Sequence, residues 1–366
     1  MSGNTFGRAL RLTTFGESHG PGLGGILDGC PAGLPIDEDA IQAELDARKP
    51  GSGLAGTKRR ESDKLEILSG VFNGLATGTP IGFYIKNENA RSGDYGNLEE
   101  IFRPGHADWS YYKKYNGVRD HRGGGRASGR ETAARVVGGA IAKQILSRLA
   151  NVRVEGACVE LGGIAVREED INLAGAMERP YFAAADYIVA AWDEAVREAR
   201  ESGDTLGGIA RIVARDVPAG LGEPVFDRLD ATLAHAIMSV GAVKGVEIGS
   251  GFAAARSRGS RNNDPLYPAG SPGRAVFGSN NAGGILGGVS SGQDIIIQAA
   301  LKPIASISIE QDTINKRGEA AKIKIGGRHD LSALPRALPV LSAMTALAIA
   351  DALLLQRRMD IIPYER

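Results

Sequence analysis

Two spacings of apolar residues along the chain separate expected strands from expected helices. Short apolar segments bounded by glycine or proline are typical of strands, and longer segments with a period near ~3.6 residues are typical of helices. The first kind lies at residues 24–27, 82–85, 209–213 and 295–299. The second kind lies at residues 37–49, 132–149, 183–201, 226–240 and 337–355.

Strands that cluster ahead of a long helix predict α+β layers rather than regular βαβ winding. Helices 132–149 and 337–355 are apolar around most of their circumference, so each needs cover on more than one side. Two sheets that enclose a helical layer would give this cover. At 337–355 we predict a buried helix, because Pro339, Ser342 and Asp351 interrupt the segment and a membrane span needs ~20 nearly continuous apolar residues.

An internal repeat predicts two pseudo-equivalent halves. Its landmarks occur twice in the same order, at 23–26 and 206–209, 31–34 and 218–221, 66–70 and 247–251, 77–81 and 291–295, and 124–126 and 326–328. We expect a single domain over residues 1–366, with halves at about 10–150 and 200–360 and a linker at about 151–200. Paired halves also predict a site that draws residues from both.

Composition limits the classes of function that remain. Lys plus Arg and Asp plus Glu each number 43, so a global basic field for nucleic acid is absent and an anion site must be built locally. The 51 glycines punctuate apolar segments and mark tight turns and close backbone approaches. Cys30 and Cys158 stand far apart, and residues 1–10 lack a signal-peptide core, so we expect a cytoplasmic protein without a disulfide framework or membrane span.

Ser18 and His19 form a glycine-flanked pair that either lies on a surface turn or belongs to a site for an anion. A Ser-His-Asp hydrolase is disfavoured, because adjacent residues form the required hydroxyl-to-imidazole bond poorly and no Gly-x-Ser-x-Gly surrounds Ser18. His106 also follows a glycine, close to Arg103, and such loops favour proton transfer beside an anion. His235 lies in a helical pattern, and we interpret it as structural.

A glycine- and arginine-rich loop, residues 119–130, opens onto an expected helix. Ser128 and Glu131 have the spacing of a capping box, and free N–H groups at a helix start attract phosphate or carboxylate. Arg126 and Arg130 could add bidentate contacts. A glycine hinge with solvated charges is the alternative, whereas an RGG-like RNA segment is disfavoured because aromatic residues are sparse.

Two further segments carry candidate chemistry. Residues 326–330 match the glycine loop of the first half and end in Asp330, which either serves the site or is a helix-start carboxylate beside the expected cap Ser332. Basic residues between 48 and 60 indicate either a lid over an anion or a solvated loop. Zinc or iron ligand spacing, a P-loop and a Rossmann fingerprint are all absent from the sequence, so we expect no metal.

Five sequence motifs, in order and over essentially the whole chain, resemble those of chorismate synthases. They are Gly-Glu-Ser-His-Gly at 16–20, Arg-Pro-Gly-His-Ala-Asp at 103–108, Gly-Gly-Arg-Ala-Ser-Gly-Arg-Glu-Thr at 124–132, Gly-Gly-Ile-Leu-Gly-Gly at 283–288 and Gly-Arg-His-Asp at 327–330. The resemblance implies an α+β fold, a β-α-β sandwich in which antiparallel sheets enclose a helical layer, usually assembled as a homotetramer.

The resemblance also implies a reaction. In this family 5-enolpyruvylshikimate 3-phosphate loses phosphate and a ring proton in a 1,4-elimination that gives chorismate, the last common step of the shikimate pathway to aromatic amino acids. Reduced FMN is required although there is no net redox change, and NADPH or an external flavin reductase is the expected electron source. The substrate carries two carboxylates and a phosphate, which agrees with the anion site that the residues indicate.

Residue roles follow from the same resemblance. His106 is similar to the histidine that protonates the leaving phosphate, and His19 to the one that balances charge near flavin N1. Ser18 and Asp330 match a pair that relays the proton from flavin N5. The implied flavin contacts are Arg126, Ala127, Ser128, Gly241, Ala242, Gly287, Lys302, Pro303, Ile304, Ala305, Ser306 and Arg328, and the implied contacts to substrate or NADP phosphate are Arg48 and Arg130.

Three positions depart from the family pattern. Leu54 replaces an arginine, for which a basic residue at 58–60 could stand in; Leu331 follows Asp330 in place of proline; and segment 262–279 is a few residues longer. Two other functions are to be distinguished by experiment. A non-catalytic phosphate- or RNA-binding protein would show salt-sensitive affinity without flavin dependence, and a simple NADPH-flavin reductase would oxidise NADPH without the phosphate substrate.

Overall fold

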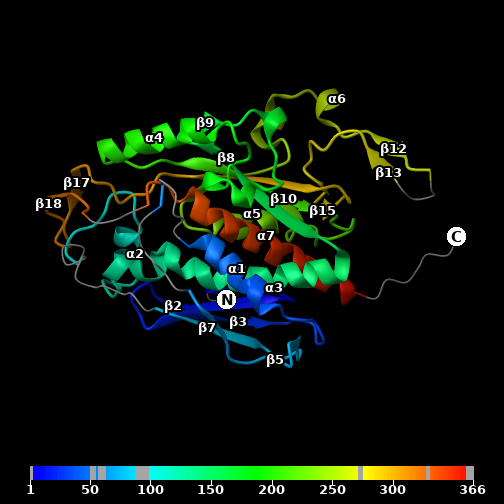
Figure 1. Cartoon of the computed structure of the whole chain (residues 1–366), viewed down its shortest axis with the longest axis horizontal. Coiled ribbons are helices and arrows are strands. Elements are labelled where there is room, and N and C mark those ends of the chain that lie inside the picture. The colour runs from blue at the N-terminus through cyan, green and yellow to red at the C-terminus, as the bar shows by residue number, and fades with distance from the viewer. Residues whose placement is uncertain are drawn as a thin grey trace.

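Two antiparallel sheets lie on opposite sides of a helical layer in the computed structural model of this chain (Figure 1). The structure describes residues 3–49, 55–56, 63–87, 99–270, 275–326 and 330–359. Strands from the start of the chain, blue and cyan, form one sheet, and later strands, green to orange, form the other. The α+β sandwich that the sequence predicts is thus confirmed.

Both sheets have five strands, and every neighbouring pair is antiparallel. The first sheet has the order β1 (Thr5–Phe6), β2 (Arg11–Gly16), β3 (Gly22–Asp28), β7 (Ile81–Lys86) and β4 (Leu65–Ile67). The second has the order β9 (Ile164–Ala165), β8 (Arg153–Leu161), β10 (Gly208–Arg215), β16 (Ile295–Leu301) and β11 (Val243–Ile248). The four strands expected from the sequence are found as β3, β7, β10 and β16.

The two sheets share one topology. In the first, β3 lies between β2 and β7 with β4 beyond; in the second, β10 lies between β8 and β16 with β11 beyond. Helix α1 (Glu38–Arg48) separates β3 from β4 along the chain, as α5 (Leu229–Met238) separates β10 from β11. A long helix comes later in each half, α3 (Thr132–Ala150) and α7 (Leu334–Arg357). Four strands of each sheet therefore share one order, with a helix inserted at the same place in each.

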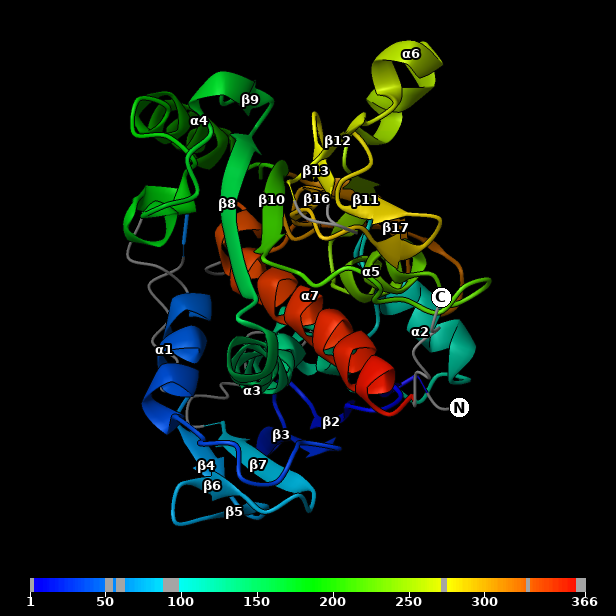
Figure 2. The ribbon, with the colours of Figure 1, turned by 90° about the vertical axis from the view of Figure 1, so that its right-hand side faces the viewer.

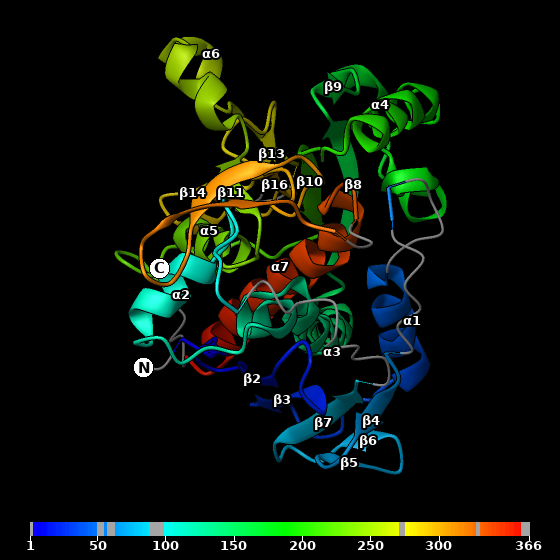
Figure 3. The same cartoon turned by 90° about the vertical axis from the view of Figure 1, so that its left-hand side faces the viewer.

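Helices α3 and α7 lie side by side between the sheets, with α1 and α5 beside them (Figures 2 and 3). α3 packs on β2 and β3, and α7 packs on β8 and β10. Helix α4 (Val189–Ser202) lies next to β9, where Trp192 Nε1 donates to the Ile164 carbonyl at 2.9 Å. The remaining elements are α2 (Asp108–Lys114), α6 (Gly259–Asn262) and the strand pairs β5 (Val71–Phe72) and β6 (Leu75–Ala76), β12 (Leu266–Pro268) and β13 (Ala275–Phe277), β14 (Ile285–Leu286) and β15 (Val289–Ser290), and β17 (Gln311–Ile314) and β18 (Ala320–Ile323).

Small residues set the spacing between the layers. A Cβ atom added to Gly138 of α3 would lie 2.8 Å from a leucine methyl on β2, and one added to Gly139 would lie 2.2 Å from Ala343 Cβ on α7. On the other face of α7, a Cβ atom added to Gly156 of β8 would lie 2.9 Å from Leu338 Cδ1. Interiors are close-packed and tolerate added atoms poorly, so these glycines permit the close approach of sheet, helix, helix and sheet.

Helix α7 is long and apolar enough to cross a membrane by length and composition, the one such helix among the described residues, yet 89% of its most apolar window is buried inside the molecule. This confirms the prediction of a buried helix. Its one acidic residue, Asp351, is also buried and accepts backbone N–H bonds from residues 8–10 at 2.6–3.0 Å. The helix thus holds the start of the chain as well as the second sheet.

The structure corrects the expected linker at residues 151–200. It contains β8 and β9, which belong to the second sheet. β8 is buried along most of its length, so it lacks the period-two alternation that marks a half-exposed strand. The helix expected near 183–201 begins only at Val189; the 3₁₀ turn Pro180–Phe182 comes before it, and the backbone is extended at Ala183.

Candidate active site

The turn between β2 and β3 carries Ser18 and His19. Its backbone closes through Gly20 N–H, which donates to the Glu17 carbonyl at 3.1 Å. A Cβ atom on Gly16, whose φ is 92°, would lie 2.2 Å from a backbone oxygen, so the entry to the turn needs glycine. His19 is only 8% exposed, so this segment is not a turn of surface polar residues.

The glycine loop packs against both histidines that the family resemblance singles out. Gly123, Gly124 and Gly125 have φ values of 60°, 86° and 53° within a 3₁₀ segment, Arg122–Ala127. A Cβ atom on Gly123 would lie 2.3 Å from His19 Cε1, and one on Gly124 would lie 3.4 Å from His106 Nε2. The loop therefore brings His19 and His106 to adjacent glycines.

A buried carboxylate holds the His106 ring. His106 Nδ1 lies 2.9 Å from Asp108 Oδ1 and 3.0 Å from Arg103 Nη2. Asp108 also accepts hydrogen bonds from Arg103 Nε at 2.7 Å and from Arg119 Nη1 at 3.2 Å. When the ring is protonated, Nδ1–H donates to Asp108 and Nε2–H faces the glycine loop, which is the orientation that a general acid needs.

Burial and neighbouring charges set the ionisation of this pair. Burial lowers the pKa of His106, as do Arg103 and Lys302, although Asp108 opposes them. Burial alone would favour the neutral acid of Asp108, but the hydrogen bonds from His106 and Arg103 hold the pKa of that carboxyl far below its usual range. His106 is therefore a neutral ring beside a fixed negative charge at neutral pH.

A segment of the second half reaches the His106 loop. Lys302 Nζ donates to the Gly105 carbonyl at 2.7 Å, and Lys302 N–H donates to the Ala242 carbonyl at 2.9 Å. A Cβ atom on Gly105 would lie 3.5 Å from Ala305 Cβ. Burial lowers the pKa of Lys302, with Lys244 adding to the effect. Three of the expected flavin contacts, Ala242, Lys302 and Ala305, are thereby gathered beside His106.

Arg126 and Ser128 lie against the turn that carries Ser18. Arg126 donates to Thr14 Oγ1 at 2.9 Å and to the Gly16 carbonyl at 3.3 Å, and Ser128 Oγ lies 3.3 Å from Ser18 Oγ. Ala127, between them, ends the 3₁₀ segment. Two further expected contacts thus adjoin the candidate catalytic serine.

The predicted capping box is wrong. Ser128 Oγ accepts from Arg130 N–H at 3.3 Å and caps the short 3₁₀ turn Gly129–Glu131, not α3. The Glu131 side chain turns along α3 to pair with Arg135 at 3.0 Å. The extra 3₁₀ turn moves the helix start beyond the reach of Ser128, which is a difference that residue spacing alone does not reveal.

Arg48 and Arg130 converge on one buried acid. Arg48 Nη2 lies 2.7 Å from Asp63 Oδ2, and Arg130 pairs with the other Asp63 oxygen. Asp63 is fully buried, which would raise its pKa, but the two guanidinium groups lower the pKa below its usual value. Arg336 extends the network, because Nη1 binds Asp330 at 2.8 Å and Nε lies 3.4 Å from the Arg48 carbonyl oxygen.

Asn87, the first residue after β7, completes this network. It binds Arg130 and the carbonyls of the turn that holds Ser18. Polar contacts thus run continuously from Asp330 to Ser18. Sequence reasoning missed Asn87 and Asp63; the available signal was a polar residue placed directly after a buried strand and an acid close to a basic stretch.

The other expected residues lie as follows. Gly241 follows α5, and Pro303, Ile304 and Ser306 lie in the segment after β16, where Thr205 Oγ1 donates to the Ile304 carbonyl at 2.8 Å. Gly287 lies in the turn between β14 and β15, which contacts the start of α5 through a bond from Leu229 N–H to the Gly288 carbonyl at 2.8 Å. Arg328, Leu54 and the basic residues 58–60 lie outside the described residues.

The departure at Leu331 has a visible consequence. Its N–H donates to the Ala55 carbonyl at 2.8 Å, a bond that proline cannot make. Its carbonyl accepts from Leu206 N–H at 2.8 Å. The backbone after Asp330 is therefore held on both sides.

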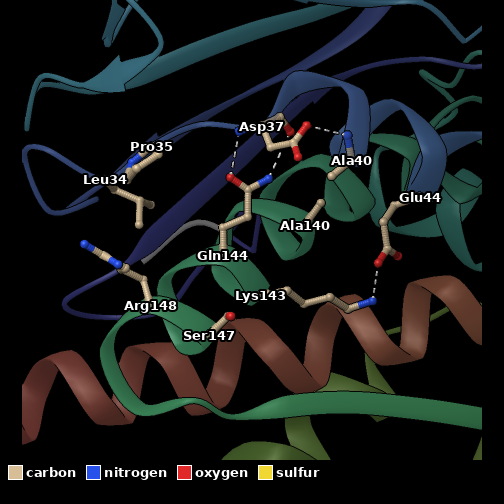
Figure 4. A pocket seen from close by; sticks show the side chains of 10 residues that line it. All are labelled: Leu34, Pro35, Asp37, Ala40, Glu44, Ala140, Lys143, Gln144, Ser147 and Arg148. Carbon is tan, nitrogen blue, oxygen red and sulfur yellow. Dashed lines mark hydrogen bonds and ion pairs between the residues drawn. The ribbon is translucent and has the colours of Figure 1, made fainter.

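A separate surface pocket of about 460 Å³ lies between α1 and α3 (Figure 4). Its polar lining is largely satisfied internally: Lys143 pairs with Glu44 at 2.6 Å, and the Gln144 amide exchanges two 3.0 Å bonds with the Asp37 backbone. It shares no described lining residue with the histidine site. Among the described residues, no group of His, Cys, Asp and Glu is placed to hold a metal ion.

Comparisons with known proteins agree with the fold and motifs. A family model described as chorismate synthase matches residues 10–354. The chain is 68% identical to a chorismate synthase of Desulfovibrio desulfuricans over 363 residues, which is 99% of this chain and 100% of that protein. It is 59% identical to one from Nitratidesulfovibrio vulgaris strain Miyazaki F, over 98% and 100% of the two chains. A crystal structure of a chorismate synthase superposes with a TM-score of 0.75 at 34% identity, over 96% of this chain and 93% of the other.

Proposed function

Because this chain belongs to the chorismate synthase family, we propose that it converts 5-enolpyruvylshikimate 3-phosphate to chorismate, as a lyase in the shikimate pathway to aromatic amino acids. The reaction is a 1,4-elimination, in which the ring loses phosphate from one carbon and a proton from another. The observation that carries the proposal is the His106 ring, held by Asp108 and facing a glycine loop that also contacts His19.

The residues at the site fit reduced FMN. Arg126, Ser128 and Lys302 are donors suited to an anionic cofactor, and the glycine loop presents backbone without side chains beside His19. When bound, reduced FMN would supply transient electron density that helps phosphate leave, without net redox change. We assign His19 to balancing the negative charge near the flavin ring, because an imidazole 8% exposed lies where such charge would be desolvated.

His106 delivers a proton to the leaving phosphate in this proposal. Without a ligand its pKa is lowered, chiefly by burial, so the ring is neutral. A bound phosphate dianion adds negative charge beside Nε2 and raises the pKa of His106, so the ring takes up from solvent the proton that it then gives to the leaving phosphate. Lys302 and Arg103 beside the ring add positive charge for the departing phosphate.

Ser18 and Asp330 carry the ring proton toward solvent in this proposal. A polar chain supports placing them in one network; it runs from the Ser18 carbonyl through Asn87, Arg130, Asp63, Arg48 and Arg336 to Asp330. Arg130, whose side chain is 10% exposed, is the more accessible of the two anchors for substrate or NADP phosphate, since the Arg48 side chain is 1% exposed.

Anaerobic turnover with chemically reduced FMN, with and without NADPH, tests the reaction and its electron source together. We expect phosphate release and chorismate formation with reduced FMN alone, and loss of about 10²–10⁴-fold of that rate in His106→Ala. His235→Ala on α5, where the ring contacts Phe6, is the matched control and should keep the rate.

Three results would redirect the proposal. NADPH oxidation without the phosphate substrate would identify a flavin reductase. RNA affinity that falls steeply with salt, without flavin dependence, would identify a binding protein. Turnover that requires a second protein would indicate an external flavin reductase. We also propose that the protein is cytoplasmic and forms a homotetramer. Light scattering of the purified protein would test the tetramer.

A further inference from the structure

The Asn87 side chain uses both ends of its amide. Asn87 Nδ2 donates to the carbonyls of Gly20 at 2.9 Å, Glu17 at 3.0 Å and Ser18 at 3.3 Å. Asn87 Oδ1 accepts from Arg130 Nε at 3.1 Å. The reverse orientation would set Oδ1 against three carbonyl oxygens and the amide N–H groups against a guanidinium, so the partners determine which atom faces which side.

The backbone of Asn87 is fixed before its side chain acts. Residue 86 is the last of β7 and pairs with Gly22 of β3. Asn87 N–H then donates to the Pro21 carbonyl at 3.0 Å, which continues that ladder by one bond. The amide therefore extends from the rim of the first sheet and reaches a turn between two neighbouring strands.

The glycine loop packs against His19, and other hydrogen bonds also reach the turn. Its own closing bond joins Gly20 N–H to the Glu17 carbonyl, and Ser128 Oγ meets Ser18 Oγ at 3.3 Å. Among the described residues, no other side chain outside this turn binds as many of its carbonyls as Asn87, which binds three. Displacing the amide would release the backbone on both sides of His19.

We propose that Asn87 is a positioning residue that holds the Ser18–His19 turn and Arg130 in one fixed geometry. The inference rests on the proposed function, because it assigns the turn to the cofactor side of the site and Arg130 to the substrate side. One amide then fixes the separation between the two. An asparagine is required, since an aspartate has the same shape but no N–H groups for the carbonyls, and an alanine binds neither side.

Asn87→Asp and Asn87→Ala test the donor end and the acceptor end of the amide separately. Asn87→Asp keeps an acceptor for Arg130 but repels three carbonyls, so kcat should fall about 10–100-fold with little change in KM, as expected for a reacting group misplaced by ~1 Å. Asn87→Ala also releases Arg130, so KM for the phosphate substrate should rise as well. Asn172→Asp is the control: its exposed side chain accepts one backbone bond, from Ala174 N–H, far from the site in sequence.

Hydrogen exchange adds a measurement that does not depend on turnover. Hydrogen exchange of the peptide that spans residues 15–23 should increase in both Asn87 variants, while peptides from β10 and β16 stay protected. If Asn87→Asp does not fold, Asn87→Ser, which keeps one hydroxyl donor, replaces it and should fall between wild type and Asn87→Ala in exchange and in kcat.

The outcomes are distinguishable. Wild-type turnover together with control-like kcat in the Asn87 variants would overturn the inference and leave the proposed function intact. Absence of wild-type turnover with reduced FMN would overturn the proposed function, and the exchange of residues 15–23 would still decide whether Asn87 holds the turn. A uniform loss of protection across both sheets, with kcat falling in step, would show a general structural role and would also overturn the inference.

Discussion

Asp108→Asn isolates the charge that holds His106. The change keeps the shape of the side chain but removes a carboxylate that lies 2.9 Å from His106 Nδ1 and binds both Arg103 and Arg119. In the wild type Asp108 raises the pKa of His106 against the effect of burial. Without that charge, protonated His106 becomes less stable and the amide no longer selects one ring orientation.

The magnitude follows from what the carboxylate contacts. Losing the ring orientation and part of the protonated population of His106 together should cost about 10²-fold in kcat or more, up to the ~10²–10⁴-fold that general acid catalysis contributes. In the proposed reaction His106 acts when protonated, so the rate should be lost as pH rises through its pKa in the complex. Because Asp108→Asn lowers that pKa, the alkaline limb of the kcat profile should move to lower pH.

Stability should fall as well. The side chains of Arg103 and Asp108 are 6% and 2% exposed, and breaking a buried ion pair costs about 3–5 kcal/mol. For a chain of 366 residues the melting temperature should therefore fall by about 5 °C. Asp216→Asn is the control, because its pair with Arg153 is about half exposed and such pairs are worth at most ~1 kcal/mol.

The assay is anaerobic phosphate release with reduced FMN, measured from acid to alkaline pH well below the melting temperature of the variant. An Asp108→Asn protein that keeps both the wild-type kcat and the wild-type alkaline limb would refute the reasoning. A lower melting temperature with unchanged kinetics would assign Asp108 to stability alone.

Further changes test other parts of the structure. Gly123→Ala places a methyl group 2.3 Å from His19 Cε1 and should abolish most flavin-dependent turnover, whereas Gly33→Ala has similar backbone strain with no atom within 4 Å and should keep it. Asp63→Asn should make the free energy of unfolding less dependent on pH in the acid range. The pKa of Asp63 is lowered on folding, so its stabilisation is present above pH ~4 and is lost as the pH falls, as unfolding curves at several pH values would show. Asp351→Ala leaves buried N–H groups of residues 8–10 without their acceptor and should lower the unfolding free energy by about 1–3 kcal/mol in denaturant titration.

Much of the fold could be predicted from the sequence because its signals are periodic or repeated. The apolar circumference of 337–355 predicts a covered helix, and the duplicated landmarks predict two equivalent sheets. The sequence does not reveal β8, because a strand buried along most of its length shows no alternation of apolar and polar residues. The capping box failed because a 3₁₀ turn, which leaves no clear mark in the sequence, lies between Ser128 and α3.

Candidate site residues could be named from the sequence, but their contacts could not. Motifs place His19 and His106 among the candidates, but only the structure shows that adjacent glycines touch both rings. Asp63 and Asn87 have no pattern of their own, because a single buried acid or amide gains its meaning from partners many positions away. Such long-range polar pairing is set by the packing of sheets and helices.

The crossing of α3 and α7 at Gly139 and Ala343 has a consequence beyond packing. Ser18 and His19 project from the first sheet, whereas Lys302 follows a strand of the second. The thickness of the helical layer therefore sets the distance between the parts of the site that the two sheets carry. One methyl group added at Gly139, deep in the interior, would push α3 and α7 apart and so change the geometry of the site from a distance.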